Sequence, residues 1–234
     1  MTTMQGTGPQ QPTNPPRPKK AYRGLAMEGF IARWYAKNTG RHKESYRKSA
    51  ELVAGQLADG ASVLEIAPGP GYLAIELARL GNYRVVGLDI SQSFVEMARR
   101  NAAEAGVGVT FEQGNASEMP FAADTFDFIV CRAAFKNFAQ PVQALNEMHR
   151  VLKPGGKALI LDLRPDASSE AINAEVKSMG LGWFDSLLTR LIFKYGLVKR
   201  AYSQEQIRQM AAQTPFQTCE IQEDGIGLAV AFRK

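Results

Sequence analysis

The stretch VLEIAPGPGYLAIELARLG, residues 63–81, limits the possible folds of this chain more than any other. A short apolar run leads directly into a Gly-Pro-Gly turn, and the turn leads into an amphipathic helix that Gly81 ends. A glycine turn between a strand and a helix lets the backbone approach a ligand closely and points helix N–H groups at an anion. Residues 69–74 fit the pattern G-x-G-x-x-A, so the stretch alone allows any adenine nucleotide.

Strands and helices alternate on both sides of this stretch. Apolar or alternating runs predict five strands, at 62–67, 84–89, 107–113, 126–131 and 157–163. Helical spacing predicts intervening helices at Tyr72–Leu80, from Ser91 or Ser93 to about Ala105, and at Pro141–Leu152. A capped helix at Ser203–Gln213 and a hairpin around Asp224-Gly225 close the chain. This alternation favours an α/β fold, with a parallel sheet and helices on both faces.

The ends of the chain and one internal segment depart from this alternation. Residues 1–20 are rich in Pro, Gln and Thr and predict a disordered tail. Residues 21–58 predict N-terminal lid helices, and residues 59–234 predict the main domain. Within that domain, residues 168–200 predict a helical insertion.

Composition narrows the classes of protein. With 45% hydrophobic and 22% charged residues, the chain has the balance of a soluble globular protein. No apolar run reaches the length of a membrane span, and no signal peptide is evident, so we expect a cytoplasmic protein. Its two cysteines, Cys131 and Cys219, form no zinc-binding pair, and we expect no metal. The net charge of +5 lacks a dense basic stripe, so we expect no nucleic-acid partner.

Polar residues at three positions help to distinguish between the nucleotides that could bind. Asp89 ends the second strand, where an acidic side chain can accept hydrogen bonds from ribose hydroxyls. This position fits NAD and S-adenosylmethionine equally well. Glu65 lies inside the first strand, where an acid suits a ligand with a cationic aminoacyl end. Asn115 follows the third strand, where its amide can hydrogen-bond an adenine edge.

The motifs together resemble those of a known family. The segments VLEIAPGPG, VVGLDIS, GNASEMPF, FDFIVCRAAFKNF and RVLKPGG occur in the order and spacing of the class I S-adenosylmethionine-dependent methyltransferases, and are most similar to the ubiquinone/menaquinone-biosynthesis branch. They cover about residues 62–163. The resemblance implies a Rossmann-like seven-stranded sheet of order 3-2-1-4-5-7-6 with strand 7 antiparallel. It implies S-adenosyl-L-methionine as the cofactor and S-adenosyl-L-homocysteine as the product.

The resemblance also implies roles for ten residues. The loop at Ala67, Gly69 and Gly71 passes under the methionine portion, and Glu65 supports the aminoacyl end. Asp89 binds the ribose, while Ile90 packs on the adenine. The adenine edge meets Asn115 and Ala116, and the inner side of the cofactor meets Cys131 and Arg132. Two residues depart from the family pattern: Ala67 replaces the usual first glycine, and Asn115 stands where Asp is frequent.

The methyl acceptor leaves a weaker signal. The predicted acceptor pocket is aromatic and consists of Trp34, Tyr35, Phe135, Trp183, Phe184 and Tyr202. Candidates for a catalytic group are His42, Lys136 and Asn137, but methyl transfer often needs no strong base, because alignment and water exclusion supply much of the rate. The segment 186–200 is apolar and basic, and we interpret it as a lid rather than a membrane-surface helix.

Three functions stay open at this point. The first is a methyltransferase that acts on a small molecule, with a quinone-like or aromatic compound as the candidate acceptor. The second is a nicotinamide-dependent oxidoreductase on the same fold, although the Y-x-x-x-K match at 195–199 is interpreted as chance spacing. The third is a non-catalytic nucleotide-binding protein. The sequence does not indicate the acceptor atom or the oligomeric state.

Overall fold

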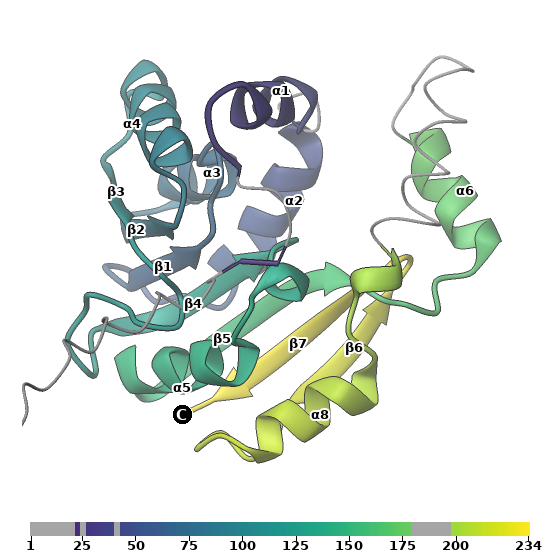
Figure 1. Cartoon of the computed structure of the whole chain (residues 1–234). Helices are drawn as coiled ribbons and strands as arrows, with labels where there is room; N and C mark the ends of the chain where they lie inside the picture. Colours follow the sequence, from purple (N-terminus) through teal and green to yellow (C-terminus); the bar gives the residue numbers. More distant parts are fainter. Residues whose placement is uncertain (1–21, 24–26, 40–42, 179–197) are drawn as a thin grey trace, which may run out of the picture.

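The computed structural model describes residues 22–23, 27–39, 43–178 and 198–234 (Figure 1). The predicted disordered tail and most of the predicted insertion lie outside these residues. The first described element after the N-terminal residues is α1 (Gly29–Thr39), which is followed by α2 (Lys43–Ala54).

The sheet has the predicted seven-stranded topology, with order β3-β2-β1-β4-β5-β7-β6. Its strands are β1 (Ser62–Ile66), β2 (Arg84–Asp89), β3 (Val109–Gln113), β4 (Phe126–Arg132), β5 (Leu152–Leu163), β6 (Glu220–Asp224) and β7 (Gly227–Arg233). The pairs among β1 to β5 are parallel, whereas β7 runs antiparallel to both β5 and β6. The chain turns to one side of β1 to form β2 and returns on the other side to form β4. The carboxyl ends of β1 and β4 therefore flank the switch point at which open α/β sheets bind ligands.

Helices cover both faces of the sheet (Figure 1). One face packs against α3 (Tyr72–Leu80), α4 (Gln92–Ala105) and α2, and the other packs against α5 (Pro141–Val151) and α8 (Gln204–Ala212). Every residue of β1 is buried. Val63 belongs to the apolar cluster on the α3 face and Leu64 to the cluster on the α5 face, as the two-residue period of a strand requires.

Several boundaries differ from the sequence expectation. The second of the helices predicted within residues 21–58 ends at Ala54 rather than at residue 58, and β3 begins at Val109 rather than at residue 107. The Pro154-Gly155-Gly156 part of the RVLKPGG segment forms a bulge within β5, because the register with β4 jumps between the pairs Phe126–Leu152 and Phe128–Lys157. The bulge contains the unpaired residues that lie between the end of α5 and the regular part of β5. The tight hairpin turn falls at residues 225–226, one position later than expected, because Asp224 pairs with Gly227.

The predicted insertion is described only at its two ends. Its first part forms α6 (Ser169–Ser178), and its last residues form the short 3₁₀ helix η3 (Val198–Arg200). Ile172 and Val176 of α6 pack with Val198 of η3 and with Ile226 of the hairpin turn. No helix among the described residues has the length and apolar character to cross a membrane.

Candidate functional site

The turn after β1 repeats the left-handed backbone conformation three times. Ala67, Gly69 and Gly71 have φ of +56°, +55° and +82°. Left-handed backbone strains any residue with a Cβ atom by about 1–2 kcal/mol, which is why glycine is usual at such positions. Ala67 therefore carries strain at the place where the resembling family has glycine. A strained residue in a loop beside a switch point is an observation that suggests function.

The two glycines of the turn serve different purposes. A Cβ atom on Gly71 would lie 2.7 Å from the Phe111 ring and 2.9 Å from the Ala98 methyl, so Gly71 allows α3 to pack closely against the sheet and α4. A Cβ atom on Gly69 would meet no atom within 4 Å. The backbone of Gly69 thus faces open space, as a loop that receives a ligand should.

Asp89 lies at the carboxyl end of β2, beside this turn. Its side chain is buried, and one carboxylate oxygen accepts a hydrogen bond from the Gly69 N–H at 2.9 Å while the other accepts one from the Ser91 N–H at 2.9 Å. Burial raises the pKa of Asp89 to about 6, against the lowering effect of these two hydrogen bonds. The carboxylate braces the loop and keeps acceptor sites for further hydrogen bonds.

Glu65 is the second buried acid of the site. It is 3% exposed and lies on the α3 face of β1. Burial raises the pKa of Glu65 to about 8, although the Ala74 N–H near the start of α3 donates to the carboxyl group and lowers this value. The Oε2 atom is buried and has no hydrogen-bond partner in the described part of the chain. An unpartnered carboxyl oxygen beside an open glycine turn fits a ligand that carries a cationic or hydrogen-donating group.

Arg132 and Cys131 end β4 and point to opposite faces of the sheet. Arg132 lies on the α2 face, where its guanidinium donates to Ser45 Oγ at 2.7 Å and Ser49 Oγ at 3.2 Å and stacks 4.5 Å from the centre of the Tyr46 ring. It lowers the pKa of Glu65. Cys131 is fully buried in the apolar cluster on the α5 face. Only Arg132 therefore shares the face on which Glu65 lies.

The residues expected at the adenine lie next to Asp89. Ile90 is 42% exposed, so its side chain offers an apolar surface on which a planar ring could stack. Asn115 accepts a hydrogen bond from the Ser117 N–H at 2.9 Å through Oδ1, so its carbonyl holds the local turn. Ala116 is half-buried and packs against the cluster on the α5 face.

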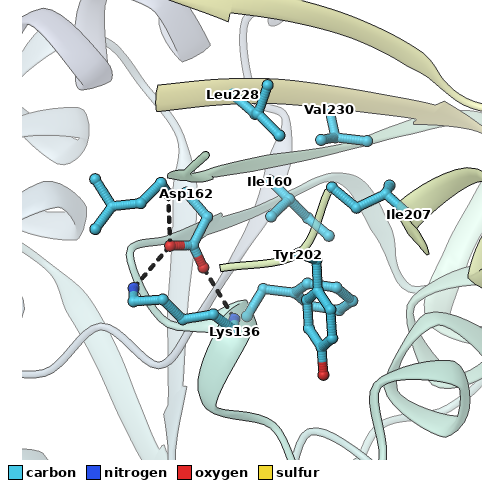
Figure 2. A pocket seen from close by; sticks show the side chains of 9 residues that line it. Lys136, Ile160, Asp162, Tyr202, Ile207, Leu228 and Val230 are labelled. Atoms are coloured by element: carbon cyan, nitrogen blue, oxygen red, sulfur yellow. Dashed lines mark hydrogen bonds and ion pairs between the residues drawn. The ribbon is translucent and has the colours of Figure 1, made fainter. Parts of the chain in front are cut away.

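A buried ion pair lies two strands further along the same edge of the sheet (Figure 2). Lys136 Nζ is 2.7 Å from Asp162 Oδ1, and the Lys136 N–H donates to Asp162 Oδ2 at 3.0 Å. Lys136 Nζ also donates to the Ala133 carbonyl at 2.7 Å. Lys136 follows β4 and Asp162 lies near the end of β5, so this pair joins the ends of two adjacent parallel strands.

A small apolar cavity of about 10 Å³, with room for about one water molecule, adjoins the ion pair. Its remaining walls are the side chains of Phe135, Ile160, Leu163, Tyr202, Ile207, Leu228 and Val230. The Tyr202 ring packs edge-on against Phe135, with a distance of 5.8 Å between the ring centroids. Asn137, the third residue of η1 (Phe135–Asn137), accepts a hydrogen bond from the Arg23 N–H through its backbone carbonyl at 2.8 Å.

The N-terminal residues are anchored at two points along this edge. Tyr22 forms an antiparallel bridge with Phe138 beyond β4. Beyond β2, the Ser91 hydroxyl donates to the Met27 carbonyl at 2.6 Å, and the Glu28 carboxylate accepts hydrogen bonds from the N–H groups of Gln92 and Ser93 at the start of α4. The described N-terminal residues therefore contact both the Asp89 side and the Lys136 side of the edge.

Tyr35 connects α1 to the Asp89 side of this edge. Its ring packs edge-on against Phe94 of α4, with the centroids 5.7 Å apart. Burial raises the pKa of Tyr35, and the nearby charges of Arg132 and Asp89 act on it in opposite directions. Of the predicted acceptor pocket, the structure brings Phe135 and Tyr202 together and places Tyr35 near Asp89.

Some predicted residues lie outside the described part of the chain. They are His42, Trp183, Phe184 and the side chain of Trp34. Sequence reasoning missed Asp162, Tyr22 and Glu28. The position of Asp162 could have been predicted, because an acid near the end of the fifth strand lies next to the residues that follow the fourth strand in a parallel sheet. Tyr22 and Glu28 had none, because only the tertiary fold brings the N-terminus to this edge. Among the described residues no cluster of three or more His, Cys, Asp or Glu side chains could hold a metal ion.

Comparisons with known proteins agree with this geometry. Residues 64–160 match the family described as a methyltransferase domain. A demethylmenaquinone methyltransferase of Deinococcus radiodurans is 39% identical over 107 residues, which are 45% of this chain and 44% of that protein. A ubiquinone/menaquinone biosynthesis C-methyltransferase of Bdellovibrio bacteriovorus is 38% identical over 120 residues, which are 50% of each chain. The match thus spans about half the length of these curated relatives.

Solved structures show the same fold. A Methanococcus maripaludis protein assigned as an S-adenosyl-L-methionine-dependent methyltransferase superposes with a TM-score of 0.72 at 22% identity, over 91% of this chain and 95% of that one. A SAM-dependent methyltransferase of Aquifex aeolicus gives a TM-score of 0.61 at 17% identity, over 82% and 97%. Residues 64–160 are therefore similar in sequence to a methyltransferase domain, and the chain shares its fold with these solved structures. The relatives that match are of the ubiquinone/menaquinone type.

Proposed function

We propose that this protein is an S-adenosylmethionine-dependent methyltransferase that acts on a small molecule. The observation that carries the proposal is the Glu65 carboxyl group, which is buried, lacks a partner for Oε2 among the described residues and lies beside a glycine turn that faces open space. A fold gains nothing from an unpartnered buried acid, since it costs stability. A ligand with an ammonium group removes that cost.

The residues present fit this cofactor. The Gly69 backbone would receive the methionine portion, Glu65 would face its ammonium group, and Asp89 would accept from the ribose hydroxyls. Ile90 offers an exposed apolar surface for the adenine. The bound cofactor would supply a methyl group already activated by the positive sulfonium. The chain would then have to orient the acceptor, exclude water and hold the charges of the site in place.

The ion pair gives Lys136 a structural part in the site. The Lys136 ammonium donates to both the Asp162 carboxylate and the Ala133 carbonyl. We therefore assign Lys136 a positioning role, in which it fixes η1 and the Phe135 ring against the end of β5.

The acceptor is proposed to be a quinone-like or otherwise aromatic molecule. Support comes from the names of the relatives. We further propose a cytoplasmic location, with α1 and α2 acting as lid helices. The family match and the relatives favour this function over the oxidoreductase alternative.

Calorimetry with S-adenosylhomocysteine tests the proposal directly. The wild-type protein should bind this ligand, and Asp89→Ala should abolish measurable binding, because it removes the ribose acceptor and a brace of the glycine turn. The exposed Glu96→Gln on α4 is the control and should bind as the wild type does. Stronger thermal stabilisation by NADH than by S-adenosylhomocysteine would favour the oxidoreductase. Cofactor binding without transfer of labelled methyl to any compound of a cell extract would favour a non-catalytic binding protein.

A further inference from the structure

Glu28 joins the start of α1 to the start of α4. Its carbonyl accepts a hydrogen bond from the Ile31 N–H, in the first turn of α1, at 3.2 Å. Its carboxylate accepts from the N–H groups of Gln92 and Ser93, the first two residues of α4, at 3.1 Å each. The first N–H groups of a helix have no partner within that helix, and the helix dipole favours an anion beside them. Glu28 thus caps α4 from a position 64 residues away in the sequence.

The neighbours of Glu28 make the same connection. The Met27 carbonyl accepts a hydrogen bond from the Ser91 hydroxyl at 2.6 Å, and the Gly29 N–H donates to the Ser93 hydroxyl at 3.0 Å. Residues 27–29 therefore contact the start of α4 one after another. Every partner in these contacts is an atom of the chain itself.

The described apolar contacts of α1 with the rest of the domain are few. The helix lies beside α4 in Figure 1. Among its described side chains, Ala32 and Ala36 are buried and Tyr35 packs against Phe94, whereas Phe30 is 74% exposed. Two alanines and one ring remove little apolar surface from water. The hydrogen bonds of residues 27–29 therefore weigh heavily in how firmly this end of α1 is held.

The start of α4 also adjoins Asp89. The Ser91 N–H donates to the Asp89 carboxylate at 2.9 Å, and burial together with the charge of Glu28 raises the Asp89 pKa. Asp89 is 5% exposed, so a ribose reaches its carboxylate only after a neighbouring part of the protein moves. The sheet fixes β2 and the turn at Gly69, whereas residues 27–29 are attached by the hydrogen bonds just described. Residues 27–29 are thus the neighbours that can move at least cost.

The N-terminal residues are also held on the other side of the glycine turn. Tyr22 pairs with Phe138, and the Arg23 N–H donates to the Asn137 carbonyl at 2.8 Å. These partners follow β4, whereas Ser91 follows β2, and β1 lies between β2 and β4 in the sheet. The described N-terminal residues therefore have anchors on both sides of the turn that would receive the cofactor.

We propose that residues 27–29 form a latch that must open for cofactor to enter or leave, with Glu28 as its main contact. The proposal rests on the methyltransferase function proposed above. Glu28 is a positioning residue, because it contacts the N–H groups of α4 rather than the cofactor. Desolvation acts to raise the pKa of Glu28, but the hydrogen bonds from Ser93 and Gln92 help to lower it overall, so the carboxylate is charged at neutral pH. Because the latch contacts involve chain atoms alone, weakening them should destabilise the closed form equally with and without cofactor.

Stopped-flow fluorescence with S-adenosylhomocysteine tests the latch. Glu28→Ala should speed both association and dissociation about fivefold, the factor that loss of a helix cap typically supplies, while Kd changes by less than about twofold. A residue that contacted the cofactor would behave differently, because dissociation would become faster and the affinity would fall by the same factor. Glu104→Ala, an exposed acid near the other end of α4, is the matched control and should keep both wild-type rates.

Ser93→Ala is an independent variant, because it removes the acceptor of the Gly29 N–H. It should also raise both rates and leave Kd unchanged. Wild-type rates in both variants would overturn the latch, and so would faster dissociation with an equally weaker affinity. Failure of the wild-type protein to bind S-adenosylhomocysteine would instead refute the proposed function.

Discussion

Replacement of Glu65 by glutamine should change how cofactor affinity depends on pH. Burial raises the pKa of Glu65 from 4.5 to about 8, which penalises the ionised form by on the order of 5 kcal/mol at 1.36 kcal/mol per pH unit. At pH 7 about nine-tenths of the ligand-free protein therefore carries a protonated Glu65. A ligand ammonium group favours the ionised carboxylate, so binding should release nearly one proton at this pH.

The cofactor affinity of the wild type should depend on pH in a way that the affinity of Glu65→Gln does not. Between pH 6.5 and 8, the affinity of the wild type for S-adenosylhomocysteine should rise by up to about tenfold per pH unit and then level off. The affinity of Glu65→Gln should be weaker and nearly flat, because a neutral amide has no proton to release. Asp89 has a pKa of about 6, so its titration is largely complete over this range.

Calorimetry in two buffers of different ionisation enthalpy counts the released protons. Glu96→Gln, an exposed acid on α4, is the control and should show the wild-type slope. Equal slopes in the wild type and Glu65→Gln would refute the reasoning, as would a wild type that releases no proton at pH 7.

The stability of the ligand-free protein should change with the same group. The folded state binds the Glu65 proton more tightly than the unfolded state does. The loss of folding stability that this carboxyl group causes is therefore absent below about pH 4.5 and grows as the pH rises towards 8. Urea unfolding should therefore show that Glu65→Gln gains stability relative to the wild type between pH 5 and pH 8.5.

The remaining predictions concern the glycine turn. Ala67→Gly should raise the free energy of unfolding, measured in urea, by about 0.5–1 kcal/mol. The relief of backbone strain at φ +56° outweighs the entropy that a glycine adds to the unfolded chain. The control Ala78→Gly, within α3, should instead lower the free energy of unfolding by about 1 kcal/mol. Gly71→Ala should lower it by roughly 2–4 kcal/mol, because its methyl group would overlap the Phe111 ring. Gly69→Ala should cost only about 1 kcal/mol but weaken cofactor binding more than tenfold, because its methyl group would enter the open space above the loop. Equal losses of stability in Gly69→Ala and Gly71→Ala would contradict the separate roles assigned to these glycines.

Much of the fold follows from local sequence patterns. Alternating strands and helices predict the parallel sheet, since a crossover helix must cover each face in turn. The turn at Gly69 and Gly71 predicts a ligand-binding loop because its conformation is local. The Lys136–Asp162 pair needs more than local information, because it forms only when β4 and β5 lie side by side. The anchoring of Met27 and Glu28 on α4 depends on tertiary packing between segments 64 residues apart, for which the sequence gives no period or spacing.

The polar groups at the amino end of the parallel strands are hydrogen-bonded, whereas some of those at the carboxyl end are not. At the amino end, Asp127 accepts hydrogen bonds from the N–H and hydroxyl of Ser62 and from the Lys153 ammonium, and its pKa is lowered to about 2 against the effect of desolvation. This network is satisfied, so it stabilises the join between β1, β4 and the β5 bulge. At the carboxyl end, by contrast, Glu65 has a raised pKa and an unpartnered oxygen, Ala67 has a strained backbone, and Tyr202 has an unpartnered hydroxyl.

Each feature at the carboxyl end breaks a rule of local consistency, and a simple substitution would remove each of them: Gln for Glu65, Gly for Ala67 and Phe for Tyr202. Natural sequences break such rules mainly where a function requires it. Strained backbone also occurs at Asp124, at the amino end of β4, so the buried and unpartnered carboxyl oxygen of Glu65 is the feature that points to this edge independently of any relative. A bound cofactor should remove the penalty at Glu65. The stabilisation of the wild type by S-adenosylhomocysteine, measured as the rise in thermal midpoint at about pH 7.5, should then exceed that of Glu65→Gln under the same conditions.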